Sequence, residues 1–249
     1  MNDIPSVTVV IPSVGSDFLE DALSSVENQT YENLKIHIFC DGPKHFSKVM
    51  YIADSVNTVD VLITNLAENV GKVDGQNFYG HRIYAASPHL TNSDYVFFLD
   101  EDNYYEKTHV QSLVDLCEKY KLDFSFSFRK IVDKNRVYLC DDLCESLGMW
   151  PIYGNSLNGY LVDTSSYCMR RSFLIQTGYL WHYGWGGDRR WFNIMRERGP
   201  DYVKYGTTAR PTLNYRLEGN ENSVKIDFFR NGNWKANPLN FKERMNIEH

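Results

Sequence analysis

A row of acidic residues follows directly on an apolar stretch near the middle of the chain. Residues 95–98 are aromatic or β-branched, which predicts a buried strand, and Asp100, Glu101 and Asp102 come immediately after it. On an extended backbone, Asp100 and Asp102 project to the same side. Two carboxylates on one side favour a divalent cation, which prefers hard oxygen ligands. The stretch is also typical of a solvated acidic turn, so the elements around it decide between the two interpretations.

Asp188 is a second acid in a position suited to chemistry, because it follows two glycines at the start of a predicted helix. Aromatic faces next to an acid suit stacking on a sugar or a base, and this segment offers Trp181, His182, Tyr183 and Trp185. The alternatives are structural: Asp188 caps its helix, where an acid is favourable, and the aromatic side chains pack a core.

Composition limits the classes of protein to consider. With 249 residues, of which 43% are hydrophobic, the chain is long enough for one large α/β domain or two small ones. Its net charge of −6 argues weakly against binding to nucleic acid or anionic membranes, although a local basic face stays open. Five cysteines without zinc-type spacing predict a reducing, cytoplasmic compartment. No signal peptide and no apolar run of membrane-spanning length is recognisable.

Strands and helices alternate in the first half of the chain. Apolar runs predict strands at residues 7–12, 34–39, 59–64 and 95–99, and apolar residues at helical spacing predict helices at 17–26, 47–55, 74–86 and from residue 110 on. Asp17 and Glu20 fit a capping box at the first helix. The alternation predicts a doubly wound sheet, whose ligands bind beyond the carboxyl ends of the strands. Neither a Gly-x-Gly-x-x-Gly nor a Gly-Lys-Ser/Thr loop is present, which disfavours dinucleotide and Walker-type phosphate binding.

The pattern changes after residue 123. Phenylalanines at positions 124, 126 and 128 alternate with serines, which predicts a strand with one buried face. Residues 133–166 look irregular, a strand is predicted at 167–169, and helices are predicted at 172–177 and 188–198, each followed by glycine. For the last fifty residues we expect short strands and an extended tail.

Taken in order, several short motifs resemble those of the family 2 glycosyltransferases. The strand at 7–12 and the Asn-Gln-Thr-Tyr turn at 28–31 are similar to the family's first strand and "NQTY" turn. Cys40-Asp41-Gly42 resembles its "DDG" motif, with cysteine in place of the first Asp. Asn69-Val70-Gly71 with Asn77 resembles its "NxG…ARN" segment, with Gln76 in place of arginine.

Further motifs continue the resemblance, which covers roughly residues 5–223. Residues 99–103 look like the family's "LDxDD" metal motif, and Met169-Arg170-Arg171 with Gly178 resembles its "RRxxxxxxGG" segment. Gly187-Asp188 corresponds to an "ED" pair with glycine replacing Glu, and residues 215–220 resemble a "YRxH" segment with Glu218 replacing His. The resemblance implies a GT-A fold, which is α/β and Rossmann-like, with a mostly parallel central sheet and flanking helices. It also implies a single domain with a nucleotide-sugar-binding half at 1–123, an acceptor-binding, catalytic half at 124–223, and a C-terminal extension at 224–249.

The resemblance assigns the metal site to acids from two parts of the chain. Asp102 would be the direct metal ligand, and Asp100 would contact the metal through water or hold the ribose. Glu218 would add a third oxygen, although a solvated loop acid explains it equally well. Oxygen ligands suit Mn²⁺ or Mg²⁺ rather than zinc.

For the nucleotide, the resemblance implies that Asp41 accepts a hydrogen bond from a base N–H, which indicates uracil or thymine. Pro12 and Ser13 would line the same base, and Asn69 and Lys72 would approach the ribose or diphosphate. The alternatives are that Asp41 shapes the turn before Gly42-Pro43 and that Lys72 is a solvated lysine.

The resemblance makes Asp188 the general base that takes the proton of the acceptor hydroxyl, with inversion at the anomeric carbon. His182 is a second candidate for the base. The residues expected on the acceptor side are Trp150, Tyr153, Trp181, His182 and Trp185.

The predicted function is that of a metal-dependent inverting glycosyltransferase, a hexosyl- or pentosyltransferase. It would move a sugar from a nucleoside-diphosphate sugar, with uridine preferred, to an acceptor hydroxyl on a glycan, a small molecule, a protein or a nucleic acid. A DNA-modifying transferase is one such case, because residues 225–244 mix basic and aromatic side chains. An inactive nucleotide-sugar-binding module is the alternative, suggested by the departures at Cys40, Gln76, Gly187 and Glu218. A nucleotidyltransferase is disfavoured, because residues 12–16 contain neither Arg nor Lys.

Overall fold

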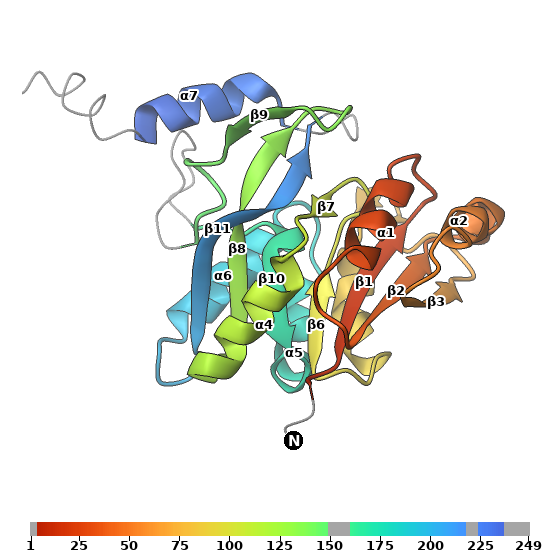
Figure 1. Ribbon diagram of the computed structural model, residues 1–249, viewed down its shortest axis with the longest axis horizontal. Coiled ribbons are helices and arrows are strands. Elements are labelled where there is room, and N and C mark those ends of the chain that lie inside the picture. The colour runs from red at the N-terminus through yellow and green to blue at the C-terminus, as the bar shows by residue number, and fades with distance from the viewer. Residues whose placement is uncertain (1–3, 149–159, 218–223, 237–249) are drawn as a thin grey trace, which may run out of the picture.

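The first half of the chain forms one wing of a central sheet. The computed structural model describes residues 4–148, 160–217 and 224–236 (Figure 1). Four of the sheet's strands, in the spatial order β3-β2-β1-β6, run parallel: β1 (Val7–Ser13), β2 (Leu34–Cys40), β3 (Asp60–Asn65) and β6 (Tyr95–Phe98). The two central strands, β1 and β6, are almost wholly buried, as expected for apolar runs covered on both faces.

The second half of the chain extends the same sheet beyond β6. Its strands follow in the order β10-β8-β11-β7, and β9 pairs with β8: β7 (Tyr104–Tyr105), β8 (Phe124–Val132), β9 (Tyr138–Asp141), β10 (Tyr167–Arg170) and β11 (Tyr205–Arg216). β8 and β11 are parallel, whereas β10 runs antiparallel to both β6 and β8. One sheet therefore passes through both predicted halves, and the fold is the α/β architecture that was expected. The division at residues 123 and 223 stays a prediction.

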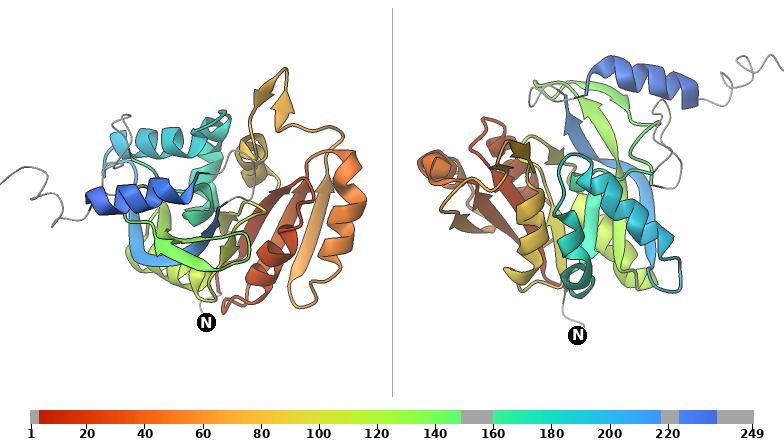
Figure 2. Two further views of the ribbon diagram at one scale, coloured as in Figure 1. Left: turned by 90° about the horizontal axis from the view of Figure 1, so that it is seen from above. Right: turned by 180° about the vertical axis from the view of Figure 1, so that it is seen from behind.

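Helices cover both faces of the sheet (Figure 2). On one face a core cluster joins the strands to α1 (Leu19–Glu27), α2 (Phe46–Ala53) and α4 (His109–Tyr120). On the other face a second cluster includes side chains of α3 (His81–Ala86), α5 (Arg171–Thr177) and α6 (Gly187–Glu197), with the 3₁₀ turn η4 (Gly178–Trp181). A third, smaller cluster joins β8 and β9 to α7 (Ile226–Ala236), which lies beside β9 in Figure 1.

The strand order reverses between β1 and β6, because the chain moves from β1 outward to β2 and β3 and then returns to the other side of β1. Val10 of β1 pairs with Phe98 of β6, and the Leu99 N–H donates to the Val10 carbonyl at 3.0 Å. The carboxyl ends of these two strands are thus neighbours, and such a switch point is where open α/β sheets bind ligands. Residues 12–13 and 99–103 lie at this edge.

Two local predictions in the first half were wrong. The helix expected at residues 74–86 begins only at His81, because residues 72–77 form a small hairpin of β4 (Lys72–Val73) and β5 (Gln76–Asn77). Asp74 and Gly75 both have positive φ angles, as an Asp-Gly hairpin turn requires. The capping box at the first helix is also absent, because Phe18 is its N-cap residue and Asp17 pairs with Lys48 at 2.6 Å instead.

Two predictions in the second half were also wrong. β8 has no solvated serine face, because Ser125 and Ser127 are completely buried, and the Ser125 hydroxyl donates to the carbonyl of Leu113 in α4 at 2.9 Å. The last fifty residues contain a strand of 12 residues, β11, and the helix α7, which buries Phe229. In the described ranges no helix is both long and apolar enough to cross a lipid bilayer.

Candidate active site

Asp100 lies at the carboxyl end of β6, at the switch point. Its Oδ1 accepts a hydrogen bond from the Tyr84 hydroxyl at 2.7 Å, and its backbone N–H donates to Ser165 Oγ at 3.1 Å. Burial raises the pKa of Asp100 to about 8, and the negative charges of Asp102 and Asp163 add to the rise. The carboxyl is therefore held in a place where a negative charge is costly without a nearby cation.

The backbone around Asp102 is fixed by Arg216, at the end of β11. The Arg216 guanidinium donates to the Asp102 carbonyl at 2.9 Å and to Asp21 of α1 at 2.5 Å, and the Arg216 backbone N–H donates to Asn103 Oδ1 at 3.0 Å. The acidic loop after β6 is thus tied to the first helix and to the far strand. These bonds hold the two aspartates of the loop in one place relative to the sheet.

Asp188 lies in the first turn of α6, which begins after Gly186 in a left-handed conformation at φ 81°. Asp188 Oδ1 accepts the N–H of Arg189 at 2.7 Å, so part of its carboxylate does serve the helix start. Burial raises the pKa of Asp188, the charge of Asp163 raises it further, and the charges of His81 and Arg189 oppose them. The charge of Asp188 in turn raises the pKa of Asp100. Acids far apart in the sequence therefore face one site.

Sequence reasoning missed Asp163, whose charge acts on both of these acids and raises the pKa of Asp100 and of Asp188. Its Oδ1 accepts the N–H of Ser165 at 2.9 Å, at the start of the 3₁₀ turn η3 (Thr164–Ser166), and its Oδ2 accepts from Arg129 at 2.5 Å. An Asp followed by Thr-Ser-Ser signals a capped turn, but no local pattern shows that this turn reaches the end of β6.

Asp163 belongs to a buried cluster of ion pairs around Arg129. Arg129, in β8, donates to Asp142 at 2.8 Å, to Glu145 at 2.6 Å and to Asp163, and all four residues are less than a tenth exposed. Asp142 also accepts the backbone N–H groups of residues 144, 145 and 146. Glu145 also lies 3.9 Å from Arg189, but three carboxylates beside two guanidinium groups still leave this cluster with an excess of negative charge.

The predicted base-binding residues lie at the ends of β1 and β2. Asp41 is buried, and its two carboxylate oxygens accept the N–H groups of Val70 at 2.6 Å and Gly71 at 3.0 Å. Burial raises the pKa of Asp41, and these two amides oppose the rise. The carboxylate thus anchors the loop at 69–71 to β2, a structural role that differs from the predicted shaping of the turn before Gly42-Pro43. A role toward a base N–H stays a prediction.

The remaining residues predicted for the nucleotide occupy the same edge. The Ser13 hydroxyl donates to Glu101 at 2.5 Å, which ties the end of β1 to the acidic loop. Pro12 packs on Gly80, where a Cβ would meet Pro12 Cγ at 2.8 Å. The Asn69 amide donates to the Asp41 carbonyl and accepts the Lys72 N–H. Lys72 is an exposed residue of β4. Their roles toward ribose and diphosphate stay predictions.

The aromatic residues before Asp188 divide into two groups. Trp181 is fully buried among Tyr84, Phe98 and Trp191, so its position is that of a core residue. His182 is exposed and stacks on Phe78, with ring centroids 5.4 Å apart. Trp185 is 68% exposed and is thereby available to a partner molecule. Trp150, Tyr153 and Glu218 lie outside the described residues.

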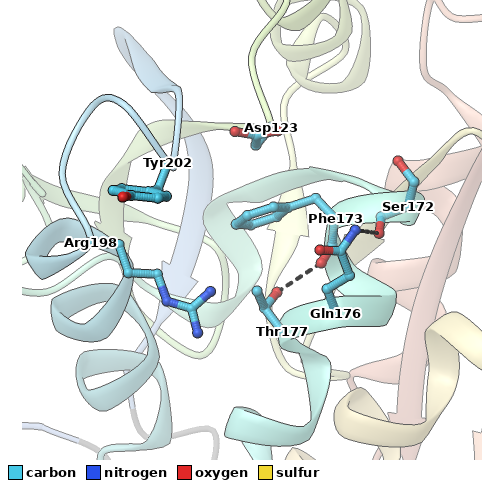
Figure 3. Close-up of a pocket in the computed structure, with 7 residues that line it drawn as sticks. All are labelled: Asp123, Ser172, Phe173, Gln176, Thr177, Arg198 and Tyr202. Atoms are coloured by element: carbon cyan, nitrogen blue, oxygen red, sulfur yellow. Dashed lines mark hydrogen bonds between the residues drawn. The ribbon is translucent and has the colours of Figure 1, made fainter.

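A cavity of about 590 Å³ lies elsewhere in the described part of the chain (Figure 3). Its lining comes from the start of β8, from α5 and from the end of α6: Asp123, Ser172, Phe173, Gln176, Thr177, Arg198 and Tyr202. These elements meet at the amino ends of β6 and β8, opposite the switch point, since Arg170 just before α5 pairs with Tyr95 at the start of β6. The cavity is therefore separate from the acidic site.

Solved structures similar in fold belong to TarS of S. aureus. TarS 1-349 superposes with a TM-score of 0.62 at 13% sequence identity, and the match covers 85% of this chain and 60% of that one. TarS 1-349 in complex with UDP-GlcNAc gives a TM-score of 0.62 at 12% identity, covering 90% of this chain and 64% of that one. The chain thus spans less than two-thirds of either TarS chain. The likeness shows a GT-A glycosyltransferase fold, as expected.

The sequence itself gives the family. The family model described as "Glycosyl transferase family 2" matches residues 8–173, well over half of the chain. The chain therefore belongs to glycosyl transferase family 2. No curated protein matches the sequence significantly.

Proposed function

We propose that this chain is a metal-dependent inverting glycosyltransferase, which moves a sugar from a nucleoside-diphosphate sugar, with uridine as the preferred nucleoside, to an acceptor hydroxyl. The observation that carries the proposal is the meeting of Asp100 and Asp188 at the switch point of a family 2 fold. One acid lies where a diphosphate would bind, and the other comes from the later half of the chain. A displacement reaction needs groups on both sides of the anomeric carbon.

The residues at the site fit a hard divalent cation, Mn²⁺ or Mg²⁺. The available ligand atoms are carboxylate oxygens. Burial and neighbouring acids raise the pKa of Asp100 to about 8. The cluster around Arg129 adds three more carboxylates. In the described ranges no three His, Cys, Asp or Glu side chains converge to form a complete cage. Mg²⁺ commonly uses one or two protein carboxylates and completes its shell with substrate phosphates and water, so Asp102 and Asp100 suffice, with Glu218 as a further candidate. When bound, the cation would act as a Lewis acid for the departing diphosphate.

Side chains of the protein would bind the nucleotide, orient the acceptor and deprotonate its hydroxyl. Asp41, with Pro12 and Ser13, would receive the base at the ends of β2 and β1, and Asn69 and Lys72 would approach the ribose and diphosphate. Asp188 would take the proton of the acceptor hydroxyl as that oxygen attacks the anomeric carbon from the face opposite the diphosphate. General-base catalysis of this kind contributes about 10²–10⁴ in rate. The exposed rings of His182 and Trp185 would flank the acceptor.

The proposal is tested by donor binding and turnover. We expect a screen of nucleoside diphosphates and their sugars to raise the melting temperature most with a uridine nucleotide, and more with Mn²⁺ than without it. Asp102→Asn should weaken the Mn²⁺-dependent part of this shift and remove turnover. Slow Mn²⁺-dependent hydrolysis of a donor sugar by the wild type would separate an enzyme from an inactive binding module. Unchanged turnover in Asp102→Asn would remove the metal assignment.

A further inference from the structure

A histidine from the first half of the chain holds the loop that carries Asp188. His81, the first residue of α3, is only 8% exposed. Its Nδ1 lies 2.8 Å from the Tyr183 carbonyl oxygen and 3.0 Å from that of Gly184. Because both partners are acceptors, Nδ1 carries a hydrogen and donates it.

Close packing at Gly187 places this ring directly beside Asp188. A Cβ at position 187 would lie 2.6 Å from His81 Nδ1 and 2.7 Å from Cε1, closer than atoms approach without displacement. The ring also meets Trp181 edge to face, with centroids 6.0 Å apart. The glycine that stands where the family motif has Glu is thus required by the histidine. The departure at Gly187 and the ring of His81 thus form one arrangement.

The charge of His81 acts on Asp188 as well. Burial raises the pKa of Asp188, and the charge of His81 is the strongest influence that lowers it, ahead of Arg189 on the same helix. The groups around Asp188 come from every element packed against it: His81 from α3, Arg189 from α6, Asp163 before η3, Asp100 after β6, Tyr167 from β10, and Glu145. Four of these six are acids or a phenol, so His81 is one of the two that can supply positive charge.

We propose that His81 is the positioning residue of Asp188: Nδ1 fixes the backbone at residues 183–184, and the ring packed on Gly187 is a source of positive charge next to the carboxylate. The inference rests on the proposed function only in giving Asp188 the role of base. It predicts that a group outside the reacting atoms controls both where the base lies and at which pH it is ready. A purely structural histidine would do only the first.

Two substitutions separate the two roles without any substrate. In His81→Asn the side-chain amide reaches the position of Nδ1 and keeps the donor, but no second ring nitrogen remains. His81→Phe keeps a ring and loses both nitrogens. Hydrogen exchange of residues 182–188 measures the hold on the loop, and ¹³C NMR titration of the Asp188 carboxyl, assigned by its loss in Asp188→Asn, measures the pKa. His89→Asn, at an exposed histidine of the next turn, is the matched control.

We expect His81→Phe to speed exchange in residues 182–188 about tenfold, because it removes the donor that holds them, and His81→Asn to leave exchange close to the wild type. Both substitutions should raise the pKa of Asp188, and the acid limb of kcat/KM for transfer should move to higher pH in His81→Asn. Should His81→Phe not fold, Gly187→Ala, which drives a methyl group into the intact ring, should give the same faster exchange. Unchanged exchange in the folded variant would refute the hold on the loop.

An Asp188 titration in His81→Asn that overlays the wild type would refute the charge role. Both readouts need only the free protein. If the wild type turned over no donor, the proposed function would fail while the exchange and titration results would still decide the role of His81.

Discussion

Two groups of carboxylates in this molecule are stabilised in opposite ways. Around Arg129, Asp142 is buried, accepts three backbone amides and pairs with a guanidinium. Burial raises the pKa of Asp142, but the charge of Arg129 and the amides outweigh it, so the net shift is downward. At the switch point, burial and the charges of Asp102 and Asp163 raise the pKa of Asp100 to about 8, although the hydrogen bond from Tyr84 opposes the rise. The same side chain is structural in one place and available for chemistry in the other.

What differs is the source of positive charge. Within the described ranges, neither Asp100 nor Asp188 forms an ion pair with lysine or arginine, whereas the Arg129 cluster contains its cation. Asp163 belongs to both groups, because it binds Arg129 and its charge reaches Asp100 and Asp188. A folded protein tolerates an uncompensated acidic site when a ligand supplies the charge. The comparison therefore separates carboxylates that stabilise the fold from carboxylates that are available to bind a ligand.

The largest expected effect is on catalysis at Asp188. Asp188→Asn should keep the fold and the Mn²⁺-dependent binding of the nucleotide, but lower the rate of transfer by about 10²–10⁴, because the amide cannot take the acceptor's proton. Transfer and nucleotide binding are measured on the same preparation. Glu197→Gln, at an exposed acid near the end of the same helix, is the control and should behave as wild type. A rate within a few-fold of wild type would assign the base elsewhere, with His182 the next candidate.

Breaking the structural group should destabilise the fold instead. Arg129→Met leaves three buried carboxylates without their cation, so we expect a loss of about 3–5 kcal/mol in the free energy of unfolding, measured by urea denaturation. Arg136→Met removes the same residue type from an exposed pair with Asp21 and should cost less than about 1 kcal/mol. Equal losses in the two variants would show that burial of the Arg129 group has no special weight.

The functional group should behave in the opposite sense in the metal-free protein. A folded-state pKa of about 8 for Asp100, above its ordinary value of 3.8, means that its stability contribution is complete below pH 4 and is lost as the pH rises through 8. Asp100→Asn keeps an acceptor for Tyr84 and carries no charge. It should therefore melt at the same temperature as wild type near pH 4 and several degrees higher near pH 9, on the scale of roughly 2–4 °C per kcal/mol.

That measurement is made in a chelator, with Asp115→Asn, at an exposed acid of α4, as the control. The variant should gain stability and lose Mn²⁺-dependent nucleotide binding at once. A lower melting temperature for Asp100→Asn at pH 9 would contradict the view that Asp100 lacks a nearby positive charge.

The first wing of the sheet could be predicted from the sequence because its signals are local. Apolar runs gave β1, β2, β3 and β6 within a residue or two, and the acids at the end of β6 were recognised from their place after a buried strand. Family motifs brought Asp188 to the same site. The hairpin at residues 72–77 was missed although Asp74-Gly75 is a turn signal, because the surrounding residues also fit a helix.

The second wing depends on contacts that no local pattern shows. Ser125 and Ser127 read as a solvated face, but helices cover both sides of β8. Arg129 and Asp163 are ordinary polar residues in the sequence, and their pairing arises only when β8 and the turn before β10 come together. His81 likewise gains its role from a loop that lies about a hundred positions further along the chain. Long-range polar contacts therefore set the limit of the prediction.

The smallest loss of stability is expected at Lys130, the residue next to Arg129, where the largest loss is expected. Lys130 follows Arg129 in β8 but pairs with Glu106 at 2.7 Å, with the two side chains 30% and 42% exposed. Lys130→Met should cost about 0.2–1 kcal/mol in urea denaturation at neutral pH, because water and salt screen such a pair. Burial raises the pKa of Glu106, but Lys130 and Asn214 lower it more, so the net shift is downward. The stability that the pair contributes is therefore present above the ordinary pKa of Glu106 and is lost as the pH falls. The difference from wild type should shrink in high salt and in acid, whereas that of Arg129→Met should persist in high salt. A loss for Lys130→Met as large as that for Arg129→Met would show that burial does not distinguish the two pairs.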